Sequence, residues 1–178
     1  MTRGMVRAAL VVALLVPCVV PAQERPAADP KDVESVDAII GALYEVISGP
    51  AGQTRNWDRM RSLFAPGAQL VPVRVPPEGA ASLVRLGVED YITRVGPQLE
   101  RTGFFEREIG RRLDSFGHIA HAFSAYESKR TPDDAQPFAR GINSIQLLND
   151  GSRWWVVAIY WDSERPGTPI PPQYISRE

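Results

Sequence analysis

Between residues 32 and 50 the apolar residues recur every three or four positions. One face of a helix repeats at that spacing, so the pattern predicts a helix over residues 33–47. Asp32 stands where an N-cap is expected, and Gly49-Pro50 is typical of a helix end. The first folded element of the chain is therefore expected to be a helix.

Two further helices are expected downstream. Residues 56–64 place Trp57 on the same face as the other apolar residues of a short helix. Residues 87–101 show the same spacing over a longer stretch, with Tyr91 on the apolar face. Pro97 lies inside this third helix. Because proline lacks an amide hydrogen and its ring crowds the preceding turn, it predicts a break or kink there.

From residue 105 on, the apolar period changes to two, which is the period of a strand. The pattern predicts strands over residues 105–116 and 119–128, and two more within residues 141–162 that turn at Asn149-Asp150-Gly151. One earlier strand is expected over residues 68–75. Helices thus come first and a meander of strands comes last. That order predicts an α+β domain with helices on one face of an antiparallel sheet.

The last two strands are apolar on both faces. A loop of two or four residues after Asn149 places Asn143, Tyr160 and Asp162 on one face, where Ala158 is small enough to leave space. A loop of three residues would exchange the two faces. This face is either a filled core or the wall of a cavity, since apolar walls with a few polar groups are typical of binding pockets.

Composition and charge exclude one class of function. The chain has 178 residues, 44% of them hydrophobic, which suits one globular domain. Its formal net charge is −1 and its 20 Lys and Arg residues are scattered, so no basic face for nucleic acid is expected. The hairpin face opposite Asn143 carries Trp155 and Trp161. An exposed apolar patch of that size is typical of a homodimer surface.

The first residues have the pattern of an export signal. Residues 1–22 combine two arginines, an apolar run and small residues before a cleavage point, which predicts a signal peptide and a secreted or periplasmic protein. A retained membrane anchor is the alternative, although the run is short for a span, and no membrane span is expected after cleavage. Cleavage would remove Cys18, the single cysteine. We expect a flexible linker at residues 23–31, the domain at 32–164 and a Pro-rich tail at 165–178.

Four stretches carry a family resemblance: NWDRMRSLFAPGAQL, FGHIAHAFSAYES, RGINSIQLL and DGSRWWVVAIYWDSE. With the element order, they resemble the nuclear transport factor 2-like superfamily, which includes SnoaL-like polyketide cyclases and ketosteroid isomerases, over residues 33–164. The resemblance implies a cone-shaped curved antiparallel sheet wrapped around three helices from the N-terminal half, a pocket at the wide end, and often a homodimer through the outer sheet face. The superfamily includes enzymes, binding modules and assembly domains, so the fold does not decide the function. The isomerases' base and oxyanion-donor motif is not recognisable at matching positions.

Asp162 is the best candidate for a catalytic carboxylate. It ends the last strand on the same expected face as Tyr160, and a carboxylate near apolar walls suits a general base acting on a carbon acid. Tyr160 or Tyr126 would then donate a hydrogen bond to the enolate oxygen. The alternative is a strand-end aspartate paired with an arginine. The residues expected to contact a ligand are Trp57, Tyr91, His121, Tyr126 and Asn143.

No metal or cofactor is expected. His118 and His121 are the only histidines, and residues three apart on a strand point to opposite faces, so they cannot hold one metal together. Glycine-rich phosphate-binding motifs are missing from the sequence. The charged stretch around Glu106 and Glu108 is interpreted as a solvated strand face with cross-strand pairs.

Three functions therefore remain open. The leading interpretation is an exported domain with a small apolar pocket that binds a small apolar or amphipathic molecule, or assembles with a partner, without catalysis. The alternative is an isomerase, cyclase or dehydratase that abstracts a proton with Asp162. A purely structural module is the third. The enzyme requires a carboxylate or histidine inside the cavity, opposite a tyrosine or asparagine donor, whereas the structural module requires a filled core.

Overall fold

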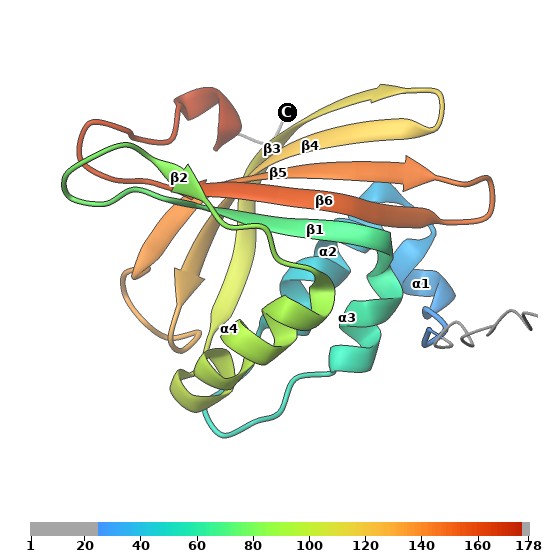
Figure 1. Cartoon of the computed structure of the whole chain (residues 1–178), viewed down its shortest axis with the longest axis horizontal. Helices are drawn as coiled ribbons and strands as arrows, with labels where there is room; N and C mark the ends of the chain where they lie inside the picture. Colours follow the sequence, from blue (N-terminus) through green and yellow to red (C-terminus); the bar gives the residue numbers. More distant parts are fainter. Residues whose placement is uncertain (1–24, 176–178) are drawn as a thin grey trace, which may run out of the picture.

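Six strands form one sheet in the order β2-β1-β6-β5-β4-β3, and α2, α3 and α4 lie against one of its faces (Figure 1). We call this the inner face and the opposite one the outer face. The computed structural model describes residues 25–175. The elements in that range are α1 (Pro30–Val33), α2 (Val36–Ile47), α3 (Trp57–Leu63), β1 (Phe64–Arg74), β2 (Ser82–Leu83), α4 (Val88–Thr102), β3 (Phe105–Phe116), β4 (Ile119–Lys129), β5 (Ala139–Asn149), β6 (Trp154–Ser163) and the 3₁₀ helix η1 (Pro172–Tyr174).

The predicted signal peptide, residues 1–22, lies outside the described residues, as does Cys18. In the segment expected to be a linker, Arg25 Nη1 donates to the Phe64 carbonyl oxygen at 2.9 Å. None of the helices in the described part of the chain is both long and apolar enough to cross a membrane. The segment after β6 returns to the outer face, where the Tyr174 ring packs on Phe123.

The first predicted helix is divided into α1 and α2. Asp32 is not a cap: its carboxylate pairs with Arg59 at 2.7 Å. Ser35 caps α2 instead, because its Oγ accepts a hydrogen bond from the Ala38 amide at 3.0 Å, and Asp29 caps α1. The apolar spacing continues from Val33 to Val36 across the boundary between the two helices, so the pattern does not reveal the cap at Ser35.

α4 runs through Pro97 as one continuous helix, so of the break or kink that was predicted, the break does not occur. A proline removes the hydrogen bond to the carbonyl group four residues earlier, here that of Thr93. Thr93 and Pro97 are both exposed. Water can therefore satisfy the Thr93 carbonyl, which lowers the cost of the missing bond.

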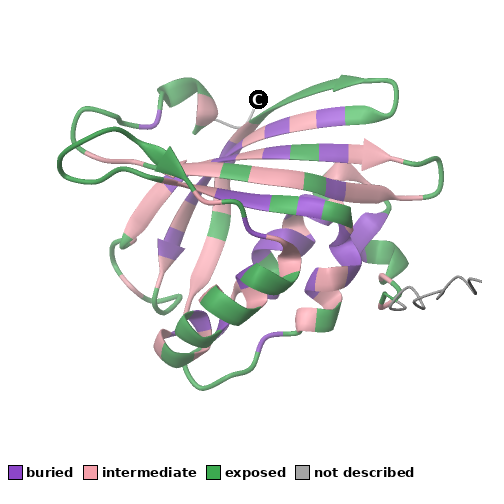
Figure 2. Ribbon diagram, in the orientation of Figure 1, coloured by how far each residue is buried: buried purple, intermediate pink, exposed green. Residues whose placement is uncertain are grey.

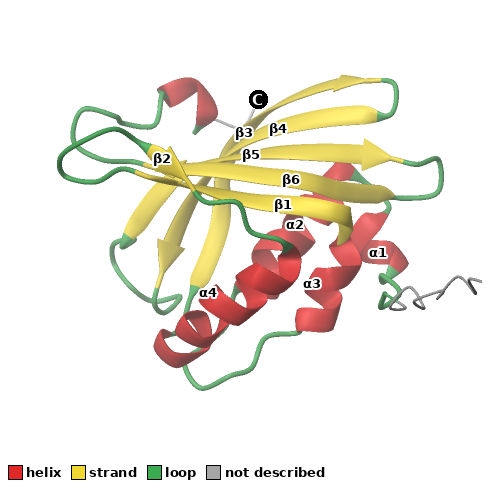
Figure 3. Ribbon diagram, viewed as in Figure 1, coloured by secondary structure: helices red, strands yellow, loops and turns green. Residues whose placement is uncertain are grey.

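The α+β class is confirmed, with one difference in the sheet. β1 pairs parallel to β6, whereas the pairs β3–β4, β4–β5 and β5–β6 are antiparallel, so the sheet is mixed. Register shifts interrupt β1, β3 and β6. Such bulges bend a strand and increase its twist. Figure 3 shows the long strands curving around the helices, which gives the sheet its cone-like form.

The β5–β6 hairpin has one of the two expected loop lengths, but the faces predicted for the later part of β6 are wrong. Asn149 pairs with Trp154 across a four-residue loop, and Leu147 pairs with Val156. Val157 is then an extra residue, because Gln146 pairs with Ala158. A one-residue slip moves every later side chain to the other face. Ile159 and Trp161 consequently point inward, while Tyr160 and Asp162 point outward.

The core lies between the inner face and the helices. Figure 2 shows buried positions along the strands above α2, α3 and α4, whereas the turns and the β1–β2 hairpin are exposed. The fully buried side chains come from helices and strands alike; the largest are Phe64, Ile39, Ile40, Met60, Leu63, Ile145, Leu147 and Val156.

Candidate functional site

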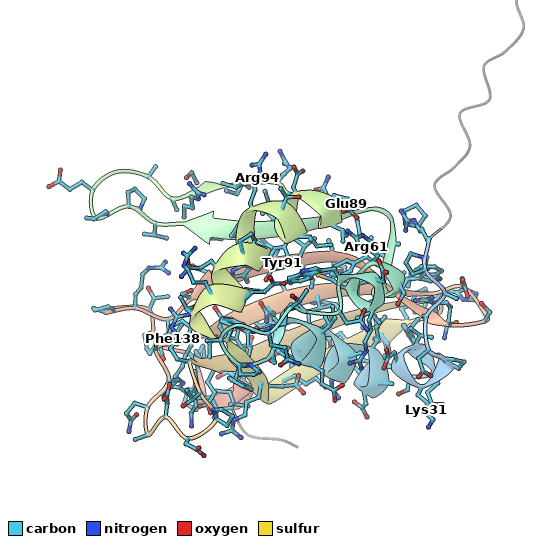
Figure 4. All side chains as sticks on the ribbon, turned by 90° about the horizontal axis from the view of Figure 1, so that it is seen from below. Lys31, Arg61, Glu89, Tyr91, Arg94 and Phe138 are labelled. Carbon is cyan, nitrogen blue, oxygen red and sulfur yellow. The ribbon has the colours of Figure 1, made fainter. Side chains whose placement is uncertain are left out.

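A cavity of about 260 Å³ remains inside the cone. Its walls are mostly apolar side chains from α2, α4 and the inner face of the sheet. The polar lining residues are Tyr44, Tyr91, Glu106, Tyr126, Ser128 and Asn143. Among the lining residues, all of which the structure describes, only Phe138 is exposed. Its ring contacts Phe104, and we place the cavity mouth there (Figure 4).

Glu106 brings a carboxyl group into this cavity. The Ser128 hydroxyl donates to Glu106 Oε2 at 2.7 Å, and Asn143 Nδ2 lies 3.5 Å from Oε1. Burial raises the pKa of the Glu106 carboxyl to about 7, against an ordinary value of 4.5, and these two hydrogen bonds offset part of the increase. The group is therefore close to half ionised at neutral pH.

The end of α2 fixes the position of Glu106. Ser48 Oγ accepts a hydrogen bond from the Glu106 amide at 3.0 Å and donates to the Tyr44 carbonyl oxygen at 2.6 Å. The neighbouring residue Gly49 pairs with Phe104 through two backbone hydrogen bonds. Buried Arg55 donates to the Gly49 carbonyl at 2.6 Å and to the Leu99 carbonyl at 3.2 Å. This arginine therefore joins the α2–α3 loop to α4 beside the site.

Three tyrosines line the cavity together with Glu106. Burial raises the pKa of Tyr44 and Tyr91 well above the ordinary range and that of Tyr126 to about 12. The negative charge of Glu106 adds to each of these increases. All three hydroxyls therefore stay protonated near neutral pH and can act as hydrogen-bond donors.

The hydroxyl of Tyr44 already forms hydrogen bonds with two side chains of the protein. Ser124 donates its one hydroxyl hydrogen to Glu108 at 2.6 Å, so in the 2.7 Å bond between Tyr44 and Ser124 the donor is Tyr44. Tyr44 in turn accepts from Asn143 Nδ2 at 3.2 Å. By contrast, Tyr91 Oη and Asn143 Oδ1 make no hydrogen bond with any of residues 25–175. These two atoms are therefore available to a ligand.

Three of the predicted ligand-contacting residues line the cavity, namely Tyr91, Tyr126 and Asn143. Trp57 and His121 do not. The Trp57 ring packs on Gly96 of α4, where a Cβ atom would lie 2.8 Å from it, and its Nε1 donates to Glu100 at 3.0 Å. His121 lies on the outer face, where Nε2 is 2.8 Å from Ser144 Oγ.

The predicted catalytic pair lies on the wrong face for this cavity. Tyr160 is 46% exposed on the outer face. Asp162 pairs with Arg165 at 2.8 Å, which is the alternative that the sequence left open. The cause is the bulge at Val157, which moves both side chains away from Asn143. The prediction that the three residues share one face is therefore wrong.

Sequence reasoning missed Glu106 and Tyr44. Glu106 was interpreted as part of a solvated strand, because arginines follow it closely. Uninterrupted pairing outward from the short turn at Gly117 would set Glu106 opposite Lys129, on the other face from Tyr126. The register shift between Glu108 and Gly110 sets Glu106 opposite Ser128 instead, and the sequence pattern does not show this shift. Within residues 25–175 there is no cluster of three histidine, cysteine or acidic side chains suited to a metal.

Comparison with known proteins identifies the fold. No protein-family model matches the sequence, and a search of curated proteins gave no match either. Among solved structures, an NTF2-like protein of unknown function from Silicibacter pomeroyi is 15% identical, with a TM-score of 0.51 over 74% of this chain and 94% of that chain. A protein of unknown function with a cystatin-like fold from Nostoc punctiforme is 10% identical, with a TM-score of 0.54 over 72% and 88%.

A third similar structure is a candidate ketosteroid isomerase from Parabacteroides distasonis. It is 14% identical, with a TM-score of 0.50 over 80% of this chain and 98% of that chain. Similarity at this level of identity concerns the fold, and the three proteins agree on it. The described residues have the nuclear transport factor 2-like fold, as the sequence resemblance predicted.

Proposed function

We propose that this domain binds a small, mainly apolar molecule in the cavity, without a cofactor and without catalysis. One observation carries the proposal: an apolar cavity gathers its hydrogen-bonding atoms around a single carboxyl group. Binding pockets combine apolar walls with a few polar groups that fix orientation in this way. The volume, about 260 Å³, lies just below the usual range of roughly 300–1,000 Å³ and suits a small ligand.

Mass spectrometry of molecules that co-purify with the protein tests this proposal. Val95 lines the cavity from α4, so Val95→Phe should fill it and abolish co-purification. Val157 is exposed on the outer face, so Val157→Phe is the matched control and should retain the ligand. Equal retention by both variants would show that any bound molecule lies elsewhere.

An enzyme that abstracts a proton from a carbon acid is the second candidate, with Glu106 as the base in place of Asp162. It is favoured by the raised pKa of the Glu106 carboxyl, because a base with a pKa near 7 is well matched to neutral conditions. The proton would pass from carbon to the carboxylate, and the enolate oxygen would accept a hydrogen bond from Tyr91 Oη.

Hydrogen exchange separates the two candidates. A ketone such as cyclohexanone is incubated with the protein in deuterium oxide, and loss of its α-hydrogen signal is followed by NMR. The enzyme candidate requires faster exchange with the unaltered protein than with Glu106→Gln. The leading proposal expects the same slow exchange with both.

We also propose export of the protein and a homodimer through the outer face. Supporting the dimer, four apolar residues form a row across the outer face, where Phe116 is 82% and Ile119 is 59% exposed and the row continues to Leu148 and Trp155. Sedimentation analysis of Ile119→Glu tests it: a dimer should dissociate. For export, mass measurement of the protein from the cell envelope or medium should show loss of residues 1–22.

A further inference from the structure

The polar end of the cavity carries one acid and no base. Glu106 is the only one of its lining residues with a carboxyl group, and no Lys, Arg or His of the described chain lines it. The other polar groups there are neutral: three tyrosine hydroxyls, the Ser128 hydroxyl and the Asn143 amide. When Glu106 is ionised, the cavity therefore carries a net negative charge.

Other enclosed carboxylates of the described chain differ from Glu106 because each has an arginine close by. Three of them have side chains that are 17% exposed or less, and each lies within 3.6 Å of an arginine. They are Asp32 beside Arg59 (12%, 2.7 Å), Glu127 beside Arg107 (14%, 2.7 Å) and Glu108 beside Arg111 (17%, 3.6 Å). Glu106 receives hydrogen bonds from neutral groups and forms no ion pair within residues 25–175.

An enclosed carboxylate without a cation is unfavourable, because its charge has lost water and gained no opposite charge. Two events can relieve this: the carboxylate binds a proton, or a cation arrives from outside. A cation from outside would enter beside the exposed Phe138 ring, one face of which is covered by the Arg130 guanidinium at 3.9 Å. A ligand with a cationic group and an apolar body would neutralise the Glu106 carboxylate and fill the apolar part of the cavity.

The walls beside Glu106 suit such a cation. Tyr91 and Trp161 form an edge-to-face pair with ring centroids 6.5 Å apart, and both line the cavity. Aromatic rings attract ammonium groups through their π faces, most strongly when water is excluded. Tyr91 Oη and Asn143 Oδ1 can also accept hydrogen bonds. An ammonium group has three hydrogens to donate, and these two atoms and the carboxylate provide three acceptors.

We infer that the cavity binds an apolar primary amine in its ammonium form, with Glu106 as the counter-ion and Tyr91, Trp161 and Asn143 around the charged nitrogen. The inference rests on the proposed binding function and names the chemical class of its ligand. Apolar carboxylic acids should not bind at pH 8, where most Glu106 carboxyl groups are ionised and repel a second negative charge. Neutral alcohols of the same shape bind more weakly, since they leave the carboxylate without a cation.

Three probes of one shape test the inference: benzylamine, benzyl alcohol and benzoate. Titration calorimetry at pH 8 should give an amine affinity higher than that of the alcohol by about tenfold or more, and no binding of benzoate. Glu106→Gln should remove the preference for the amine. Glu127→Gln is the matched control on the neighbouring strand, because Glu127 pairs with Arg107 outside the cavity and should leave the preference unchanged.

Proton release gives a second readout. At pH 6 most Glu106 carboxyl groups hold a proton, so amine binding should release close to one proton, and at pH 8 much less. Repeating the calorimetric titration in buffers of different ionisation enthalpy gives the number of protons released per bound amine. The three tyrosines that line the cavity with Glu106, namely Tyr44, Tyr91 and Tyr126, stay protonated in this range. Glu106 also lines a cleft between α2 and β3, together with Tyr44 and Glu108. The other charged residues of that cleft are Asp37, Glu45, Arg107, Arg111, Glu127 and Lys129.

The outcomes separate the inference from the function on which it rests. If benzyl alcohol binds the unaltered protein as tightly as benzylamine, the ammonium inference is wrong and the binding function stands. If no probe binds and nothing co-purifies, both are wrong. The comparison of probes needs no variant, so it remains decisive even if Glu106→Gln fails to fold.

Discussion

The two faces of the β5–β6 hairpin are both apolar, but they meet different surroundings. On the inner face, Asn143 and Ile145 are buried and line a cavity. On the outer face, Tyr160 is exposed and Asp162 pairs with Arg165 near solvent. Carboxylates show the same contrast, because Glu106 is enclosed among neutral groups whereas Asp162 has a cation. Residue type alone therefore does not identify the carboxylate that lines the cavity; the face on which it lies does.

Deleting Val157 should have the largest effect on this contrast. The bulge is the reason that Ile159 and Trp161 point inward, so its removal would turn them outward and bring Tyr160 and Asp162 into the core. Burying an unpaired carboxylate and exposing a tryptophan should together remove most of a typical stability of about 5–15 kcal/mol. Circular dichroism and urea unfolding measure this loss. The point substitution Val157→Ala, which keeps the bulge, should cost less than about 1 kcal/mol.

The next largest effect compares two isoleucines on neighbouring strands. Ile145 is buried on the inner face, and Ile145→Ala should lower the free energy of unfolding by roughly 2–5 kcal/mol. Ile119 is exposed on the outer face, and Ile119→Ala should change it by less than about 0.5 kcal/mol at low protein concentration. A loss for Ile119→Ala that grows with protein concentration would indicate that the outer face is covered by a second copy.

Much of the fold could be predicted because local patterns decide it. The apolar spacing of α2, α3 and α4 and the alternation in β3 and β4 are properties of consecutive residues, and they gave those elements to within a few positions. The parallel pairing of β1 with β6 depends on residues far apart in the chain. No local pattern records such a contact, and the sequence predicted a purely antiparallel sheet.

The candidate site could be predicted only in part, for the same reason. Asn143 and Tyr126 lie on β5 and β4, which pair with each other without a register shift, so simple alternation along these strands predicts their face correctly. Tyr160 and Asp162 lie beyond the bulge at Val157, and a bulge in an unbroken run of apolar residues leaves no mark in the pattern. Glu106 was missed because its charge suggested solvent, whereas the cross-strand partner Ser128 shows that it faces inward.

The pH dependence of stability sharpens the contrast between the carboxylates. The folded protein holds the Glu106 proton up to a pKa of about 7, whereas the unfolded chain releases it near 4.5. Stability is therefore greatest below the unfolded value and falls as the pH rises through 7, by roughly 3 kcal/mol in total. Glu106→Gln should remove this fall, measured by urea unfolding between pH 4 and pH 8.5. If the variant keeps the full pH dependence of stability, a titratable group other than Glu106 causes it.

Asp162→Asn should have the smallest effect, because Asp162 lies on the outer face. Its pair with Arg165 joins residues only three apart, and both side chains are about one third exposed or more, so the pair should contribute less than about 1 kcal/mol. The variant should also bind benzylamine as tightly as the unaltered protein, since the bulge keeps residue 162 outside the cavity. Calorimetry and urea unfolding of one preparation measure both quantities. A loss of amine binding with unchanged stability would mean that Asp162 contacts the ligand, and the assignment of the two faces would then be wrong in solution.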